Sequence, residues 1–143
     1  VASTAKLTTA TLVRRSDNTV AFLYALENSS GKVDIFGRAY DTSWRPVTSL
    51  VRVFTGLPTG TRAPQAAALD DRQILVSLVR TAGTGKVVEY GRLTATLAPT
   101  GTTARVGPFP EVLDRGLFRL ANGRVLATYS RGGAPIFIQF VTP

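Results

Sequence analysis

Two arginines, Arg38 and Arg92, stand in a setting that suggests binding chemistry. Each follows an aromatic residue and a glycine, in Phe36-Gly37-Arg38 and Tyr90-Gly91-Arg92. A guanidinium beside an aromatic ring can bind a carboxylate or the face of a sugar, and a glycine in a strand lets a ligand or another backbone approach closely. We therefore predict Arg38, Tyr90 and Arg92 as ligand-binding residues. The alternative is that each arginine forms an ion pair with an aspartate of a neighbouring unit.

A second group of candidates follows Arg38 directly. Tyr40 and Asp41 precede Trp44, the only tryptophan of the chain. We expect this segment to form an exposed turn, in which the aromatic rings can stack on a sugar. Tyr40, Asp41 and Trp44 are therefore predicted to bind a ligand as well. Aromatic residues make up only 8% of the sequence, and this low share argues against a sugar-binding protein.

Catalytic chemistry lacks its usual groups in this sequence. The chain has no histidine and no cysteine, so the common general base, the thiolate nucleophile and the usual transition-metal ligands are missing. The segment Gly83-Thr84-Gly85-Lys86 continues with Val87 and lacks the first glycine of a phosphate-binding loop. We predict a protein that is not an enzyme, with no catalytic residue, no metal ion and no cofactor.

Carboxylates are the remaining groups for acid–base work, and their positions have simpler explanations. Asp17 lies in a sequence typical of a turn, where aspartate bonds its own backbone. Asp34 and Glu89 fall within predicted strands, and we expect both to be exposed beside Lys32 or Arg92. None of them is assigned a catalytic role.

An internal repeat organises the chain. Residues 17–42 align without a gap with residues 71–96, at an offset of 54 positions, and the two aromatic-Gly-Arg segments then coincide. A weaker third copy is indicated because residues 120–126 resemble residues 69–75. The sequence predicts a single all-β domain, residues 1–143, with units at about 5–56, 62–107 and 110–143.

Each unit is predicted to contain up to four antiparallel strands. Frequent Thr and Val favour strands, and Asp, Asn and Gly mark the turns between them. The only plausible helix covers residues 63–70, which could equally begin a strand. The last unit lacks a fourth strand, for which residues 4–10 are the candidate, within the chain or in a neighbour. Strands are expected at residues 19–27, 32–40, 48–54, 86–97, 102–106 and 134–141.

This order of strands and turns resembles generic β-propeller blades of secreted and virion proteins. The resemblance covers most of the chain and implies three four-stranded blades. A propeller typically needs four to eight blades. Two chains could therefore share a six-bladed ring, or three units could close around a pseudo-threefold axis, as in a β-trefoil.

The net charge and the first residue of the chain give expectations about partners and location. The net charge is +8, with fourteen arginines and three lysines spread along the sequence. A solvated basic surface explains this charge. A basic surface would also suit a glycan or an acidic surface as a partner, and we consider nucleic acid a less favoured partner. The chain lacks methionine even at position 1, so we expect a processed protein outside the cell or on a virion. No apolar run approaches the roughly 20 residues of a membrane span.

These observations favour a structural or adhesive module that acts through self-assembly, such as a virion decoration protein or a surface-appendage subunit. The sequence predicts a homo-oligomer or a larger assembly, because the open edges of the repeats need partners. The first alternative is a glycan-binding lectin that uses the aromatic and arginine residues named above. The second is a binder of polyanions.

Overall fold

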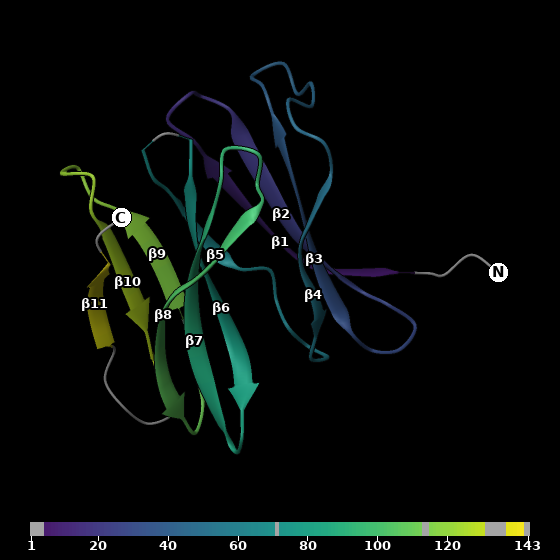
Figure 1. Ribbon diagram of the computed structural model, residues 1–143, viewed down its shortest axis with the longest axis vertical. Coiled ribbons are helices and arrows are strands. Elements are labelled where there is room, and N and C mark those ends of the chain that lie inside the picture. The colour runs from purple at the N-terminus through teal and green to yellow at the C-terminus, as the bar shows by residue number, and fades with distance from the viewer. Residues whose placement is uncertain (1–4, 71, 113–114, 131–136, 142–143) are drawn as a thin grey trace.

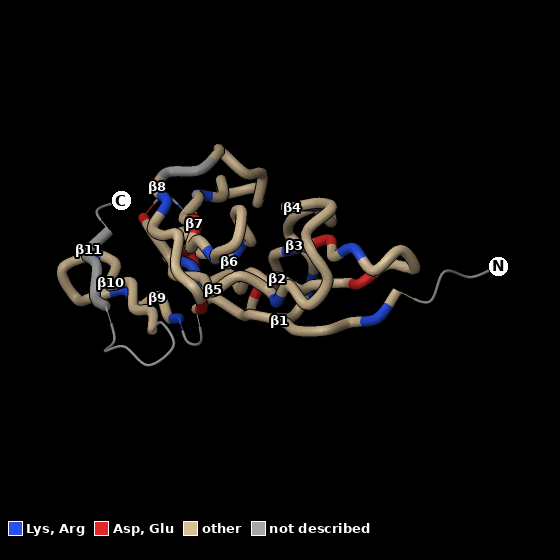
Figure 2. Tube along the Cα trace, turned by 90° about the horizontal axis from the view of Figure 1, so that it is seen from below, with Lys and Arg blue, Asp and Glu red and all other residues tan. Residues whose placement is uncertain are grey.

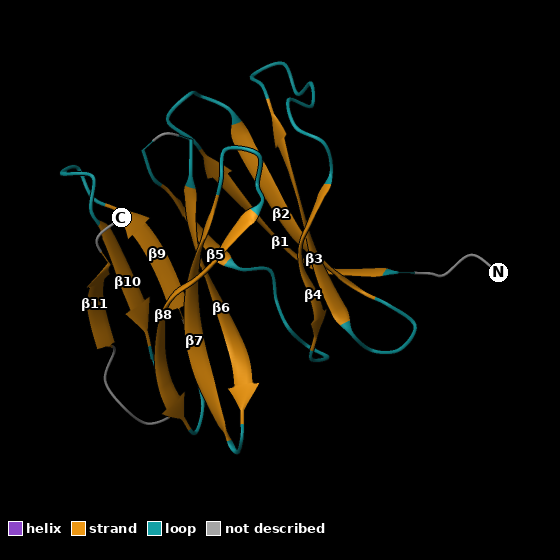
Figure 3. Ribbon diagram, in the orientation of Figure 1, coloured by secondary structure: helices purple, strands orange, loops and turns teal. Residues whose placement is uncertain are grey.

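The protein is built from strands and turns. The computed structural model describes residues 5–70, 72–112, 115–130 and 137–141, apart from the side chains of residues 102, 103 and 137–141. Within this part of the chain there is no helix (Figure 3), which confirms the all-β prediction. The eleven strands are β1 (Lys6–Arg14), β2 (Val20–Glu27), β3 (Val33–Tyr40), β4 (Val51–Leu57), β5 (Gln65–Ala68), β6 (Ile74–Ala82), β7 (Gly85–Leu93), β8 (Pro99–Phe109), β9 (Arg115–Arg119), β10 (Val125–Tyr129) and β11 (Phe137–Val141).

The strands form three antiparallel sheets, each following the order of the chain. The first sheet has the order β1-β2-β3-β4, the second β5-β6-β7-β8, and the third β9-β10-β11. The second sheet lies between the other two (Figures 1 and 2). The described sheets thus form an open row, which closes neither as a propeller ring nor around a threefold axis.

The N-terminal strand belongs to the first sheet. β1 pairs with β2 over nearly its whole length, with Leu12 opposite Phe22 and Leu7 opposite Leu26. The expectation that residues 4–10 complete the last sheet within the chain is therefore wrong for the described residues of that segment. The physical reason is proximity along the chain, because a short hairpin loop costs less entropy to close than a long one.

Residues 63–70, the one candidate helix, contain β5. This strand pairs with β6 from Gln65↔Ser77 to Ala68↔Ile74. The predicted edge strands at 48–54 and 102–106 are also present, as β4 and β8. β7 ends at Leu93 rather than at Leu97, because residues 94–98 form a turn.

One kind of turn recurs along the chain. In each case the amide of the first residue donates to the carbonyl of the fifth, and the amide of the fourth donates to the carbonyl of the first. The fourth residue has a positive φ, which suits Gly or Asn far better than other residues. These turns are Arg15–Thr19, Asn28–Lys32, Asp41–Arg45, Thr94–Ala98 and Leu120–Arg124, with Asn18, Gly31, Trp44, Leu97 and Gly123 at the fourth position.

Two apolar clusters hold the row of sheets together. The larger one lies between the first and second sheets and includes Leu23, Ile35 and Val76. The other lies between the second and third sheets and includes Leu75 and Val125. The second sheet is therefore covered on both faces, whereas β2 and β3 of the first sheet alternate between buried and half-buried residues. This alternation leaves the first sheet with one face turned outward.

Candidate functional site

The outward face of the first sheet carries the strongest candidate site. Its side chains alternate along β2 and β3 with buried ones such as Leu23 and Ile35. The pairing register brings side chains of three neighbouring strands together, because Phe36 lies opposite both Tyr24 of β2 and Arg52 of β4. We call this surface the aromatic face; it consists of Phe22, Tyr24, Phe36, Arg38, Tyr40 and Arg52.

The aromatic rings of this face form a stacked ladder. The ring centroids of Phe22 and Tyr24 are 5.2 Å apart, and those of Tyr24 and Phe36 are 5.8 Å apart. The guanidinium carbon of Arg52 lies 5.4 Å from the centre of the Phe36 ring, within the range of a cation–π contact. Aromatic pairs of this kind contribute about 0.5–1.5 kcal/mol beyond the area they bury. The ladder is thus a stable, partly exposed apolar surface.

Burial in the ladder changes the acidity of Tyr24. Desolvation is the main reason that the pKa of Tyr24 is raised above its ordinary value, and the nearby Tyr40 acts in the same direction. The positive charge of Arg38 opposes both effects without cancelling them. The Tyr24 hydroxyl therefore stays neutral over the physiological range and acts only as a hydrogen-bonding group.

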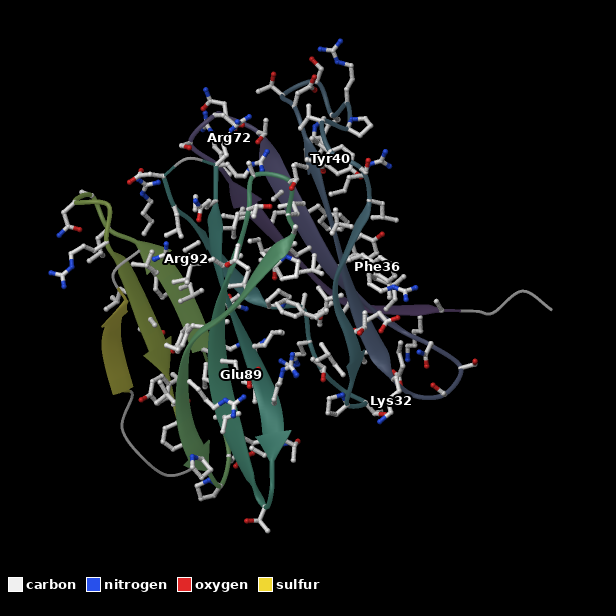
Figure 4. All side chains as sticks on the ribbon, in the orientation of Figure 1. Lys32, Phe36, Tyr40, Arg72, Glu89 and Arg92 are labelled. Carbon is white, nitrogen blue, oxygen red and sulfur yellow. The ribbon has the colours of Figure 1, made fainter. Side chains whose placement is uncertain are left out.

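Three of the predicted site residues meet at one end of the aromatic face. Arg38 donates a hydrogen bond from Nε to the carbonyl of Thr48, at 3.3 Å. Tyr40 lies at the end of β3 (Figure 4), and its ring centroid is 6.1 Å from that of Trp44, with the planes tilted by 54°. Trp44 is 65% exposed, as expected for a turn residue. Arg38, Tyr40 and Trp44 therefore border one surface.

Asp41 serves the turn that presents Trp44. Its Oδ1 accepts hydrogen bonds from the amides of Ser43, at 2.8 Å, and Arg45, at 2.9 Å, and its Oδ2 lies 2.9 Å from Nε of Arg45. The Arg45 amide, followed by the Ser43 amide and the Arg45 guanidinium, holds the pKa of the Asp41 carboxyl below its usual range. The carboxylate of Asp41 is thus occupied by its own turn.

Tyr90 and Arg92 do not join this site. Both lie on β7 in the second sheet (Figure 4 labels Arg92). Tyr90 is only 1% exposed and packs in the cluster between the second and third sheets. Desolvation, followed by the nearby Tyr129, raises the pKa of Tyr90 to about 12. Tyr90 is therefore too deeply buried to contact a ligand at the surface.

The equivalence of the two aromatic-Gly-Arg segments is also wrong in space. Opposite β2, the register places Phe36 against Tyr24, whereas opposite β6 it places Tyr90 against Ser77. The reason is that the two hairpin turns differ in length. The β2–β3 turn has three residues (29–31) between the paired Asn28 and Lys32, whereas the β6–β7 turn has two (83–84) between the paired Ala82 and Gly85. One residue of difference reverses the face on which a side chain lies. Arg38 therefore points outward, whereas Arg92 lies on the covered face with Leu75, which is opposite it on β6.

The glycine of the first segment does allow a close approach, but by the protein itself. A Cβ built on Gly37 would lie 2.8 Å from Leu23, 3.1 Å from Val53 and 3.2 Å from Leu97. Leu97 belongs to the β7–β8 turn of the second sheet and is fully buried. Gly37 therefore makes room for the packing of the second sheet on the first, rather than for a ligand.

Three arginines that sequence reasoning left without a role connect neighbouring sheets. Arg15 is only 4% exposed and donates from Nη1 to the carbonyl of Ala95, at 2.6 Å. Arg119 on β9 contacts the carboxylate of Asp70 at 2.6 Å, and Arg115 donates to the carbonyl of Ala63 at 3.1 Å. Nothing in the sequence separates these arginines from the exposed ones, because their partners lie about 50–80 residues away along the chain.

The three carboxylates considered above for acid–base work have structural roles. Asp17 accepts hydrogen bonds from the amide and hydroxyl of Thr19, which confirms its place in a turn. Glu89, labelled in Figure 4, is buried rather than exposed, and its oxygens contact Arg105 and, at 2.7 Å, Nε of Arg80. Asp34 accepts a hydrogen bond from the Gly56 amide at 2.8 Å. The described residues contain no group of three or more acidic side chains placed to hold a metal ion.

Comparison with known proteins adds no family to these observations. No family model matches the sequence, and neither the curated proteins nor the solved structures yield a match. Among the described residues, no helix has the length and apolar character needed to cross a membrane.

Proposed function

We propose that this chain is a non-enzymatic structural module that assembles by packing sheet on sheet. In this proposal the three sheets are blade-like repeats of one unit, and the aromatic face receives the outward face of the third sheet of a second copy. The observation that carries the proposal is the second sheet, which is covered on both faces by its neighbours. The aromatic face is the position where the row would continue.

The third sheet offers an apolar surface for this contact. Phe118 on β9 is 55% exposed, and Leu126 lies directly opposite it on β10. Leu12, 59% exposed, adds to the apolar area beside the aromatic face on the first sheet. Burying such side chains is favourable by roughly 25 cal/mol per Å² of apolar surface.

The arginines of the aromatic face fit the same proposal. Both existing contacts between sheets already use arginines that reach across to a carbonyl or a carboxylate, as Arg15 and Arg119 do. Arg38 and Arg52 lie on the aromatic face, against the Thr48 carbonyl and the Phe36 ring, and their remaining donors would act in the same way on a second copy. A head-to-tail contact of this kind gives a closed ring if its rotation closes and a filament if it does not. A virion or cell surface is the setting that we propose for either assembly.

Light scattering of the purified chain tests the proposal. We expect a mass of about 30 kDa, which is two copies of the 15.2 kDa chain, or a larger polymer. Phe36→Glu should return the protein to 15.2 kDa, because it places a charge at the centre of the aromatic face. Thr84→Glu is the matched control, since it adds the same charge at an exposed turn of the second sheet. A monomer at every concentration up to about 1 mM, where even weak contacts show, would refute the proposal.

Binding of an acidic glycan is the second candidate function. The specific observation is the pair of half-buried Tyr40 and exposed Trp44, with the 78% exposed side chain of Arg45 in the same turn. An aromatic ring and a guanidinium on one turn could stack on a sugar and bind its carboxylate. A glycan array with wild-type protein and Trp44→Ala separates this function from assembly. Signals lost in the variant support binding at this turn, and an array without signals argues against it.

A further inference from the structure

A polar groove lies beside β1, an edge strand of the first sheet. It has a volume of about 600 Å³ and is bordered by β1, by the connection from β4 to β5, and by the ends of β6 and β7. Hydroxyl groups of Thr9, Thr11, Thr61 and Thr81 line it. None of the residues named so far as assembly or glycan contacts belongs to this groove.

Three basic side chains from distant parts of the sequence converge on the groove. Arg62 comes from the connection between β4 and β5, Lys86 from β7, and Arg115 from β9. Among the described residues that line the groove, none is acidic, and none of these three forms an ion pair with a described carboxylate. The groove therefore collects positive charge without a counter-charge from the described chain.

The surroundings of Arg115 in this groove disfavour its charged form. Desolvation lowers its pKa from the ordinary value, and the charge of Arg62 lowers it further. Its Nε is buried and has no hydrogen-bond partner among the described residues, while Nη2 donates to the carbonyl of Ala63. A buried donor without a partner is costly, and two like charges held near one another are unfavourable. An anion in the groove would relieve both.

We propose that the groove is a binding site for a tetrahedral oxyanion, a phosphate or sulfate group of a larger ligand. Arginine presents several N–H donors that match the oxygens of such a group. Lys86 uses one ammonium hydrogen on the hydroxyl of Thr81, at 2.9 Å, and keeps two for an anion. The hydroxyls of Thr9 and Thr81 each accept a hydrogen bond, so their own hydrogens remain as further neutral donors. This site does not depend on the assembly through the aromatic face.

A titration followed by amide NMR tests the site. Inorganic phosphate and sulfate are added at constant ionic strength, with chloride and acetate as comparison anions. We expect phosphate or sulfate to shift the amide signals of residues 61–62 and 86 with a dissociation constant near 1 mM, about −4 kcal/mol. Chloride should produce no such localised shift. Whichever of phosphate and sulfate binds more tightly identifies the ester group to use in larger probes.

Variants separate the groove from general attraction of anions to a basic protein. Arg62→Ala and Lys86→Met should each weaken binding about tenfold, which corresponds to about 1.4 kcal/mol. Arg72→Ala is the matched control, because this exposed arginine lies in the β5–β6 turn, outside the groove, and binding should stay unchanged. Arg62 is exposed, so its removal is expected to leave the fold intact, as the dispersion of the amide spectrum will check. Equal weakening by Arg72→Ala, or shifts spread over the whole molecule, would overturn the proposal.

Discussion

The first and second sheets are meanders of the same order and similar sequence, yet they meet different surroundings. The second sheet has neighbours on both faces, and Tyr90 is buried there. The first sheet has a neighbour on one face only, and Phe36, which aligns with Tyr90 in the sequence, lies in the outward ladder. The difference shows that position in the row, together with the register that turn length sets, decides whether an aromatic ring serves as core or as surface.

The largest effect is expected from adjacent residues on the two faces of β2. Leu23 is fully buried against the second sheet, so Leu23→Ala should lower the free energy of unfolding by about 2–5 kcal/mol. Phe22→Ala removes a ring from the outward ladder and should cost about 0.5–1.5 kcal/mol. Urea denaturation at low protein concentration measures both. Equal losses would mean that the outward face is as tightly packed as the covered one.

A smaller effect is expected at the arginines of the two faces. Arg15→Met removes the hydrogen bond between the buried guanidinium and the carbonyl of Ala95, and it should destabilise the protein by about 1–3 kcal/mol. Arg38→Met, on the outward face, loses one hydrogen bond of 3.3 Å and should cost less than about 1 kcal/mol. Thermal unfolding compares the two variants. If Arg38→Met lowers the melting temperature as much as Arg15→Met, the proposed contrast between the faces fails.

The smallest effect is expected at Trp44, which lies in one of two corresponding turns of the first and second sheets. Trp44 and Leu97 both occupy the fourth turn position, with φ of 59° and 68°, a conformation that costs an L-residue about 1–2 kcal/mol. Trp44→Gly removes that strain from an exposed residue, and the greater chain entropy of glycine offsets part of the gain. Stability should therefore rise by less than about 1 kcal/mol.

Leu97→Gly is the matched comparison for this turn. Leu97 is fully buried, so its variant should lose stability by about 2–5 kcal/mol despite the same relief of strain. Urea denaturation measures the change in each variant. A clear loss of stability in Trp44→Gly would show that the indole ring packs as part of the fold rather than as an exposed group.

Local sequence was sufficient to predict much of the strand pattern. The predicted strands at 19–27 and 32–40 correspond to β2 and β3 within one residue, because alternating apolar residues and Asn- or Gly-containing turns act over short distances. The end of β7 was missed because Leu97 holds the turn position that normally favours Gly or Asn. Packing of its side chain in the core stabilises a conformation that its own type disfavours.

The candidate site was predicted in part. Arg38, Tyr40 and Trp44 were expected together and border one surface, since they are close in the chain. Tyr90 and Arg92 were joined to them by a gapless alignment, and the shorter turn before β7 shifted their register by one residue. The three convergent basic residues of the groove and the arginines between sheets have partners far away in the sequence, so no local pattern identified them.

The sequence by itself determined that this protein is made of antiparallel strands joined by tight turns, and that it lacks histidine and cysteine chemistry. Those properties follow from residue types and from contacts between near neighbours along the chain. Only the tertiary structure decided which face of each strand is covered and which arginines connect sheets. These outcomes depend on turn length, register and the stacking of whole sheets, in which one residue of shift moves a side chain from the core to the surface.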